Sequence, residues 1–264
     1  MNILTFLEKV LKYVTILKTI LNFMNGEEKM CEACGCDTSK IFDKKTLELL
    51  GNFHEKLSAL AERAFHNRKH FEEHKIFAIN LISAPGAGKT TLLEKTIELL
   101  KKEGHHLGII TGYLETIRNV EKFKKHGIPI YQISTKSPFI NSFLVHEAIH
   151  HLPLKEIELL FIENTEELVY LENHDIGAHL NIVLFSVTEG EDRPKKYPLI
   201  FKCSDVILIT KIDLLSILNF NLDKVIKEIK EINPKAYVIA LSAKNGKGLE
   251  EWVKFLKKFL PNKS

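Results

Sequence analysis

Hydrophobic residues in the C-terminal two thirds of the chain occur in short unbroken runs separated by amphipathic stretches. The apolar runs are FAINLIS, HLGIIT, ELLFIEN, NIVLFSV, DVILIT and AYVIAL, and runs of this length are typical of strands buried on both faces of a parallel sheet. Between them, TTLLEKTIELLKKE, FLVHEAIHHL, LDKVIKEIKEIN and LEEWVKFLKKFL repeat their apolar positions at helical spacing. We therefore predict a doubly wound α/β domain over residues 75–264, with a mostly parallel sheet and ligands at the carboxyl ends of its strands.

A polar helical pattern precedes this domain over residues 44–74. Leu57, Leu60, Ala64 and Phe71 recur at helical spacing and form one apolar face, which predicts a helical connector.

Within an N-terminal extension over residues 1–29, residues 1–25 are also apolar at helical spacing, but Glu8, Lys9, Lys12 and Lys18 interrupt the run. A membrane span needs about 20 largely apolar residues, so no span is predicted. An amphipathic surface helix is one interpretation. Another, which we favour, places the start of translation after this extension, because residues 26–29 would be encoded by a purine-rich run that resembles a bacterial ribosome-binding site.

Composition narrows the function classes. The 264 residues carry a formal net charge of +3 with interspersed signs, which gives no support for nucleic-acid binding. The chain has four cysteines, too few and too unevenly placed for a disulfide framework, so we expect a reducing, cytoplasmic setting. Cys31, Cys34 and Cys36 cluster, which predicts metal or redox chemistry, whereas Cys203 stands alone before a strand and is expected to be buried.

The scattered histidines give weaker signals. His70 and His74 lie one helical turn apart on the connector, which permits a metal pair, although nothing else in the sequence supports it. His150 lies at the end of a predicted helix and is expected in solvent.

The first apolar run leads directly into SAPGAGKT at residues 83–90, the phosphate-binding loop pattern with Ser83 in place of its first glycine. Gly86 and Gly88 allow backbone N–H groups to face a phosphate at the start of a helix. Lys89 would reach the β- and γ-phosphates, and the Thr90 hydroxyl would ligate Mg²⁺. A glycine-rich turn without a nucleotide is the alternative. The predicted nucleotide contacts of this loop are Ser83, Gly86, Ala87, Gly88, Lys89, Thr90 and Thr91.

Two later strand ends predict which base is bound. Guanine presents two N–H donors to one carboxylate, which suits Asp213 in TKID, and the Lys211 stem can lie along the base. The Ala243 N–H in the sequence SAK can donate to guanine O6, where adenine would offer a donor instead. Together with Ser242 and Lys244, these residues predict GTP rather than ATP.

With the phosphate loop, these guanine motifs and C-x-x-C-G-C, the chain resembles the HypB family of hydrogenase nickel-incorporation GTPases, in the SIMIBI class of P-loop G proteins. The stretches NLISAPGAGKTTLLEKTI, LLFIEN, SVTEGEDRPKKYP, VILITKIDLL and LSAKNGKGLEEW carry the resemblance. It implies GTP-dependent delivery of nickel to the precursor of a [NiFe]-hydrogenase large subunit. It also implies a HypA-type nickel- and zinc-binding partner and a GTP-dependent homodimer.

The resemblance implies that MCEACGCD, within a Cys-rich segment over residues 30–43, binds nickel. Three thiolates from Cys31, Cys34 and Cys36 are soft donors, and the α-amino group of Met30 would complete a square-planar Ni²⁺ site if the chain began there. Tetrahedral Zn²⁺ with an outside ligand is the competing interpretation, and a redox C-x-x-C pair is the third.

The chain departs from the family pattern at positions that bear on hydrolysis. Tyr113 stands where the family carries an aspartate near Mg²⁺, and Glu166 replaces a glycine expected to sense the γ-phosphate. Glu163 and Asn164 are retained and are expected to orient Mg²⁺ or water. Slow or weakened GTP hydrolysis is therefore predicted.

Other departures remove a metal site that the family places in its G domain. Phe139 and Ile140 take the places of its Cys-His pair, and Tyr170 replaces a further cysteine, so we expect this dimer-interface site to be absent.

The leading hypothesis is a GTP-binding nickel metallochaperone. Alternatives are a non-hydrolysing GTP-binding module for metal storage or scaffolding, a nickel GTPase chaperone for another metalloenzyme such as urease, and a P-loop kinase, which TKID and SAK disfavour.

Overall fold

The computed structural model of the chain describes residues 44–112, 117–133, 140–165 and 175–263. The chain divides into two units, Met1–Ser58 and Ala59–Ser264. Helix α2, Lys44–Glu73, confirms the helix predicted over residues 44–74, and its last turns belong to the second unit. The predicted Cys-rich segment and N-terminal extension lie outside the described residues.

The second unit contains a seven-stranded sheet in the order β3-β2-β4-β1-β5-β6-β7. Every strand pairing in this sheet is parallel, whereas the sequence predicted a mostly parallel sheet. The strands are β1 Phe77–Ser83, β2 Leu107–Thr111, β3 Ile130–Gln132, β4 Leu159–Thr165, β5 Leu180–Ser186, β6 Val206–Thr210 and β7 Tyr237–Ala240.

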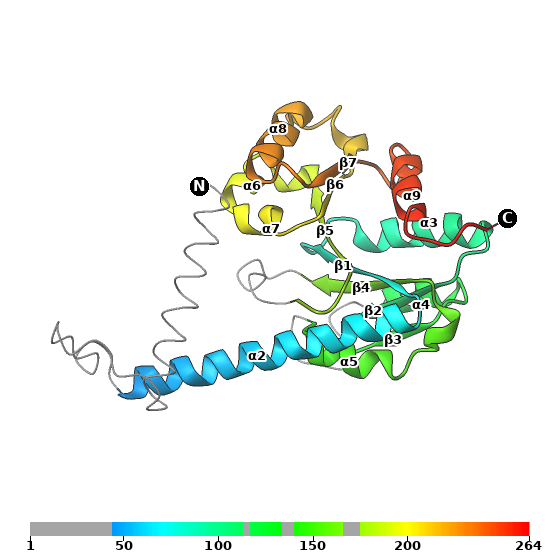
Figure 1. Cartoon of the computed structure of the whole chain (residues 1–264). Coiled ribbons are helices and arrows are strands. Elements are labelled where there is room, and N and C mark those ends of the chain that lie inside the picture. Colours follow the sequence, from blue (N-terminus) through cyan, green and yellow to red (C-terminus); the bar gives the residue numbers. More distant parts are fainter. Residues whose placement is uncertain (1–43, 113–116, 134–139, 166–174, 264) are drawn as a thin grey trace. The chain divides into compact units, whose positions relative to one another are not determined.

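Helices cover both faces of this sheet because its strands carry apolar residues on both sides (Figure 1). One face packs against α3 Lys89–Lys102, α4 Ile117–Lys124 and α9 Leu249–Lys257. The other packs against the end of α2, α5 Ser142–Ile149, α7 Pro198–Lys202 and α8 Leu222–Ile232. The doubly wound arrangement is thereby confirmed. The remaining short helices are η2 Leu154–Glu156, η4 Val187–Glu189, α6 Arg193–Lys196 and η5 Ile212–Leu214.

A buried side-chain hydrogen bond joins α9 to α3 inside the core. The buried Trp252 indole Nε1–H donates to the Thr96 hydroxyl over 2.9 Å, and that hydroxyl donates to the Leu92 carbonyl. A buried Trp is well placed when its N–H finds such an acceptor.

Two features differ from the sequence-based expectations, the short strand β3 and the exposure of Cys203. Strand β3 was not predicted, because it has only three residues and shows no periodicity. Cys203 is exposed rather than buried, since it caps the end of α7 before the chain enters β6. No helix in the described part of the chain is long and apolar enough to cross a membrane.

Candidate nucleotide-binding site

The phosphate-binding loop turns sharply between the central strand β1 and helix α3. Gly86 and Gly88 adopt φ angles of 80° and 95°, a region that side chains with a Cβ rarely occupy. Gly88 caps α3, and its carbonyl accepts the N–H of Leu92 over 3.0 Å. The loop therefore presents backbone N–H groups at the positive end of a helix, which is an arrangement suited to phosphate.

The end of β6 lies against this loop. The Thr210 hydroxyl donates to the Ala87 carbonyl over 2.6 Å, and both residues are buried. The next residue, Lys211, has φ 60°, a left-handed conformation that is uncommon for a non-glycine residue and concentrates at functional sites. A Cβ added at Gly88 would lie 3.9 Å from Lys211 Cε, so the lysine stem passes over the loop. Thr210 was not among the predicted site residues, although it directly precedes the lysine of TKID.

The guanine motifs meet the phosphate loop in one pocket of about 230 Å³. Its walls come from the end of the phosphate loop, the first turn of α3 and the segments that follow the carboxyl ends of β6 and β7, the edge of the sheet where the fold prediction placed the ligand. The pocket brings together seven predicted residues, Gly88, Thr91, Lys211, Asp213, Ser242, Ala243 and Lys244, with Leu92, Thr210, Leu214 and Leu241.

Asp213 is oriented by its neighbour in the second guanine motif. The Ser242 hydroxyl donates to Asp213 Oδ1 over 2.6 Å. An ionised carboxylate offers about four accepting positions, so this bond leaves accepting capacity for the N–H groups of a base. Backbone bonds close the loop around Ser242, whose N–H donates to Lys247 and whose carbonyl accepts from Gly246.

Lys89 connects the phosphate loop to β4. Its buried Nζ donates to the Asn164 carbonyl over 3.1 Å. The Asn164 side chain pairs with the backbone of Ile140, accepting from its N–H over 3.2 Å and donating to its carbonyl over 3.1 Å. The Asn164 amide thus holds the chain ahead of α5. A role for Asn164 in orienting Mg²⁺ or water stays a prediction.

Glu163 is fully buried one position earlier in β4, in register with Leu81 of β1 and Thr111 of β2. Ser83 and Ala87 are buried in the loop, and Thr90 is half-buried. Ile140, where the resemblance implies a histidine in the family, is buried in the hydrophobic core beneath α5. The other departures, Tyr113, Phe139, Glu166 and Tyr170, lie outside the described residues, as do Cys31, Cys34 and Cys36.

An acidic residue that the sequence analysis did not single out lies near Lys211. Glu189 accepts the Ser186 N–H over 2.8 Å and forms an ion pair with Arg193 Nε at 2.7 Å. Burial raises the pKa of the Glu189 carboxyl, while the Ser186 bond and the charges of Arg193 and Lys211 oppose that shift. This carboxylate therefore offsets part of the positive charge of Arg193 and Lys211.

Comparisons with known proteins agree with this geometry. Residues 77–240 match the family described as CobW/HypB/UreG, nucleotide-binding domain. The chain is 36% identical over 237 residues to the hydrogenase maturation factor HypB of Escherichia coli K12, covering 89% of this chain and 78% of that protein. Its fold superposes with a TM-score of 0.73 on HypB from Archaeoglobus fulgidus, at 32% identity and covering 77% of this chain and all of that one. For HypB from Helicobacter pylori, solved in complex with nickel, the TM-score is 0.71 at 29% identity, covering 78% and 99% of the two chains.

Proposed function

The chain belongs to the HypB family of hydrogenase maturation factors, and from this premise we propose that it is a GTP-binding nickel metallochaperone. It would use bound GTP while helping to insert nickel into the precursor of a [NiFe]-hydrogenase large subunit. The observation that carries the proposal is the pocket in which Gly88 of the phosphate loop meets Asp213 and Ala243 of the guanine motifs.

Different residues of the pocket would bind the phosphates and the base of the nucleotide. N–H groups from Gly86 to Thr90 would hold the phosphates, and Lys89 would move from the Asn164 carbonyl towards the β- and γ-phosphates. Asp213 would accept the two N–H donors of guanine while Lys211 covers the face of the base. A kinase acting with ATP is disfavoured, because adenine has the acceptor N1 and no N–H donor at the edge where guanine offers N1–H and N2–H₂ to the Asp213 carboxylate.

The donor set at the loop also fits a magnesium ion. Thr90 supplies a hydroxyl oxygen beside Lys89, and Glu163 supplies a buried carboxylate at the end of the adjacent strand. Mg²⁺ prefers such oxygen ligands together with the phosphates, whose developing charge it neutralises.

Hydrolysis is proposed to be slow because Tyr113 replaces a family aspartate. Loss of one carboxylate near Mg²⁺ would raise the activation free energy of hydrolysis by several kcal/mol. Each increase of about 1.4 kcal/mol slows the reaction tenfold. We expect the full chain to bind GTP and to turn it over slowly in a single-turnover assay with Mg²⁺, and Tyr113→Asp to raise the rate by at least about tenfold.

Lys89→Ala is the control for this assay and should abolish turnover in both backgrounds. A parent that hydrolyses GTP as fast as Tyr113→Asp would contradict the weakened step. A parent that binds GTP but stays inert, and remains inert as Tyr113→Asp, would favour the non-hydrolysing alternative, which Tyr113 and Glu166 both motivate.

Nickel binding is proposed for Cys31, Cys34 and Cys36, because three thiolates within six positions form a soft donor set. We expect the triple Cys→Ser variant to lose the tightest nickel site, measured by competition with a chromophoric chelator. Parallel titration with Zn²⁺ tests the competing metal. Nickel affinity unchanged in the triple variant would exclude these thiols as the site.

The same family membership supports the rest of the proposal. A HypA-type nickel- and zinc-binding protein and the hydrogenase precursor are the expected partners, in the cytoplasm, with a GTP-dependent homodimer as the working assembly. The proposed organisation is an extension over residues 1–29, a nickel segment over 30–43, a helical connector over 44–74 and the GTPase domain over 75–264.

A further inference from the structure

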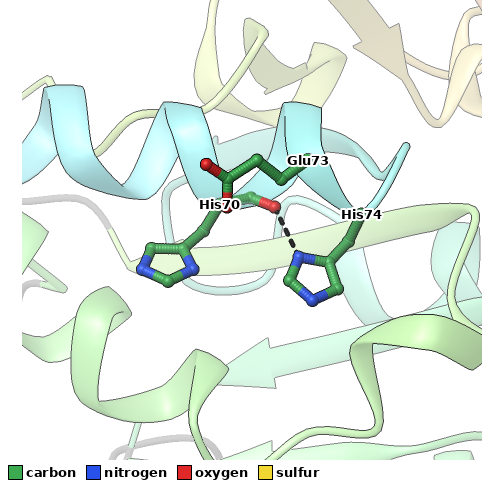
Figure 2. Close-up of side chains that lie close together, drawn as sticks. All are labelled: His70, Glu73 and His74. Carbon is green, nitrogen blue, oxygen red and sulfur yellow. Dashed lines mark hydrogen bonds between the residues drawn. The ribbon is translucent and has the colours of Figure 1, made fainter.

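Three side chains with metal-binding atoms lie at the end of α2. His70 and Glu73 belong to its last turn, and His74 directly follows the helix. Each of them offers one ligand atom, and these three atoms lie within 4.8 Å of one another. Figure 2 shows the two rings on the same side of the helix, with the Glu73 carboxylate extending back towards His70. The sequence showed the spacing of the two histidines, and the structure adds the carboxylate.

Small side-chain movements would bring the three atoms onto one ion. Ligand atoms bound at about 2.0–2.2 Å to a tetrahedral ion lie about 3.4 Å apart, so a separation of 4.8 Å has to close by at most about 1.4 Å. Glu73 is exposed and both histidines are half-buried, which leaves their side chains room to rotate. Two histidines four positions apart on one helix face also have the spacing that zinc-binding helices use.

The backbone that carries these side chains is held against the domain. Phe71 is fully buried in the hydrophobic core next to His70. Asn67, one turn earlier, is also fully buried, and its Nδ2 donates to the Ser142 carbonyl over 2.7 Å and to the Ile176 carbonyl over 3.1 Å. The last turns of α2 are therefore anchored, and only side chains need to move when an ion binds.

A hydrogen bond determines which nitrogen of His74 is open to a metal. His74 Nδ1 lies 2.9 Å from the His70 carbonyl oxygen (Figure 2). A carbonyl oxygen only accepts, so Nδ1 donates and the neutral ring keeps its lone pair on Nε2. Metal-binding histidines usually donate their second ring N–H to a carbonyl or carboxylate in this way, which fixes the tautomer.

The ligand atoms of His70 and Glu73 are available. In the part of the chain that the structure describes, neither the ring nitrogens of His70 nor the Glu73 carboxylate take part in a hydrogen bond or an ion pair. The His70 ring meets the rings of His146 and His150 edge to face, with 5.7 Å between centroids in each case. A bound ion would thus break no hydrogen bond or ion pair of His70 or Glu73 among the described residues.

From this geometry we propose that His70, Glu73 and His74 bind one divalent transition-metal ion, zinc or nickel, at the end of α2. Imidazole nitrogen is a preferred ligand of both metals, and a carboxylate oxygen can join two imidazoles on zinc. These three ligands leave at least one coordination position for water. The helix C-terminus contributes as well, because its partial negative charge attracts a cation.

A solvated helix end that carries two histidines and a glutamate is the simpler explanation of this cluster. It predicts that a metal ion binds no better to the parent than to a variant that lacks one of the three side chains. Metal affinity therefore separates the two explanations directly.

The test uses the full chain without a polyhistidine tag, in a background where the three clustered cysteines are serine so that thiols do not compete. Zn²⁺ and Ni²⁺ are titrated by calorimetry into protein freed of metal. We expect one ion per chain, and a rise of at least about tenfold in Kd for each of His70→Gln, Glu73→Gln and His74→Gln. Changes to residues that only support a ligand already cost about 10–100-fold in metal affinity.

Two exposed neighbours on α2 provide matched controls. Glu72→Gln removes the same charge as Glu73→Gln one position earlier, and His66→Gln removes an imidazole one turn before His70. Neither side chain belongs to the cluster of three ligand atoms, so both variants should keep the parental Kd. A general effect of charge would instead weaken binding in Glu72→Gln as much as in Glu73→Gln.

Thermal unfolding separates the loss of a ligand from misfolding. Glu73 is exposed, so Glu73→Gln without metal should unfold at the parental Tm and keeps the test informative if a histidine variant is destabilised. An ion that binds only the folded chain raises its Tm. Saturating Zn²⁺ should therefore raise the Tm of the parent more than that of Glu73→Gln.

Four outcomes would overturn the proposal. The first is a parent that binds no ion in the cysteine-free background, and the second is a parental Kd in any of the three ligand variants. The third is an equal loss of affinity in Glu72→Gln and Glu73→Gln. The fourth is loss of binding in His150→Gln but not in His74→Gln, which would place the ion between α2 and α5. GTP binding and the thiol-bound nickel are measured separately, so none of these results bears on the proposed chaperone function.

Discussion

Asp213→Asn is expected to lower the affinity for GTP by at least about a hundredfold and to make xanthosine triphosphate the better ligand. The carboxylate offers two acceptors to the N1–H and N2–H groups of guanine, whereas an asparagine amide offers one acceptor and one donor. Hydrogen bonds to a charged group contribute about 1.5–3 kcal/mol each, and an opposed donor adds the cost of an unpaired group. Xanthine carries a carbonyl oxygen at C2 where guanine carries its N2–H₂ group, and this oxygen can accept the N–H that the asparagine amide donates.

The variant should keep its fold, because asparagine Oδ1 still accepts the hydroxyl of Ser242. Competition of GTP, xanthosine triphosphate and ATP against a fluorescent guanine nucleotide measures the three affinities. Asp223→Asn, an exposed change at the start of α8, is the matched control and should leave all three unchanged. An Asp213→Asn protein that still prefers GTP would show that another group reads the base.

Gly248→Ala is expected to cost about 2–6 kcal/mol in the free energy of unfolding. A Cβ at this position would lie 2.3 Å from the Ala240 carbonyl oxygen and 3.0 Å from Leu241 Cα, both backbone atoms. The residue also has φ 77°. Left-handed backbone in a non-glycine residue costs about 1–3 kcal/mol, and overpacking adds about 1–3 kcal/mol.

The loss would be large because Gly248 caps α9, which places Trp252 and Leu256 in the core. Domains are stable by only about 5–15 kcal/mol. Gly246→Ala provides the control, since φ is 86° there but no atom lies within 4 Å of the added Cβ. Urea denaturation should place the Gly248→Ala midpoint well below that of Gly246→Ala. Equal midpoints would mean that the loop before α9 moves aside at little cost.

The sequence by itself determined six of the seven strands and most of the long helices, because burial of a strand or helix face sets the spacing of apolar residues within a short segment. Unbroken apolar runs such as FAINLIS and DVILIT became β1 and β6 almost residue for residue. The phosphate loop and the guanine motifs were also visible, since each is a short contiguous pattern tied to the end of a strand. Parallel topology then places those ends at one edge of the sheet, which is why the pocket was predictable in outline.

Contacts between distant segments were decided only by the tertiary structure. The bond from Thr210 to Ala87 and the pairing of Asn164 with Ile140 join elements whose sequences show no common pattern. A three-residue strand such as β3 has too few positions for any period, and its partner β2 defines it. The one-turn spacing of His70 and His74 was visible in the sequence, but the surface that these rings meet depended on the packing of the end of α2 beside α5. Helical spacing places side chains on one face of a helix, and only the fold determines which surface that face meets.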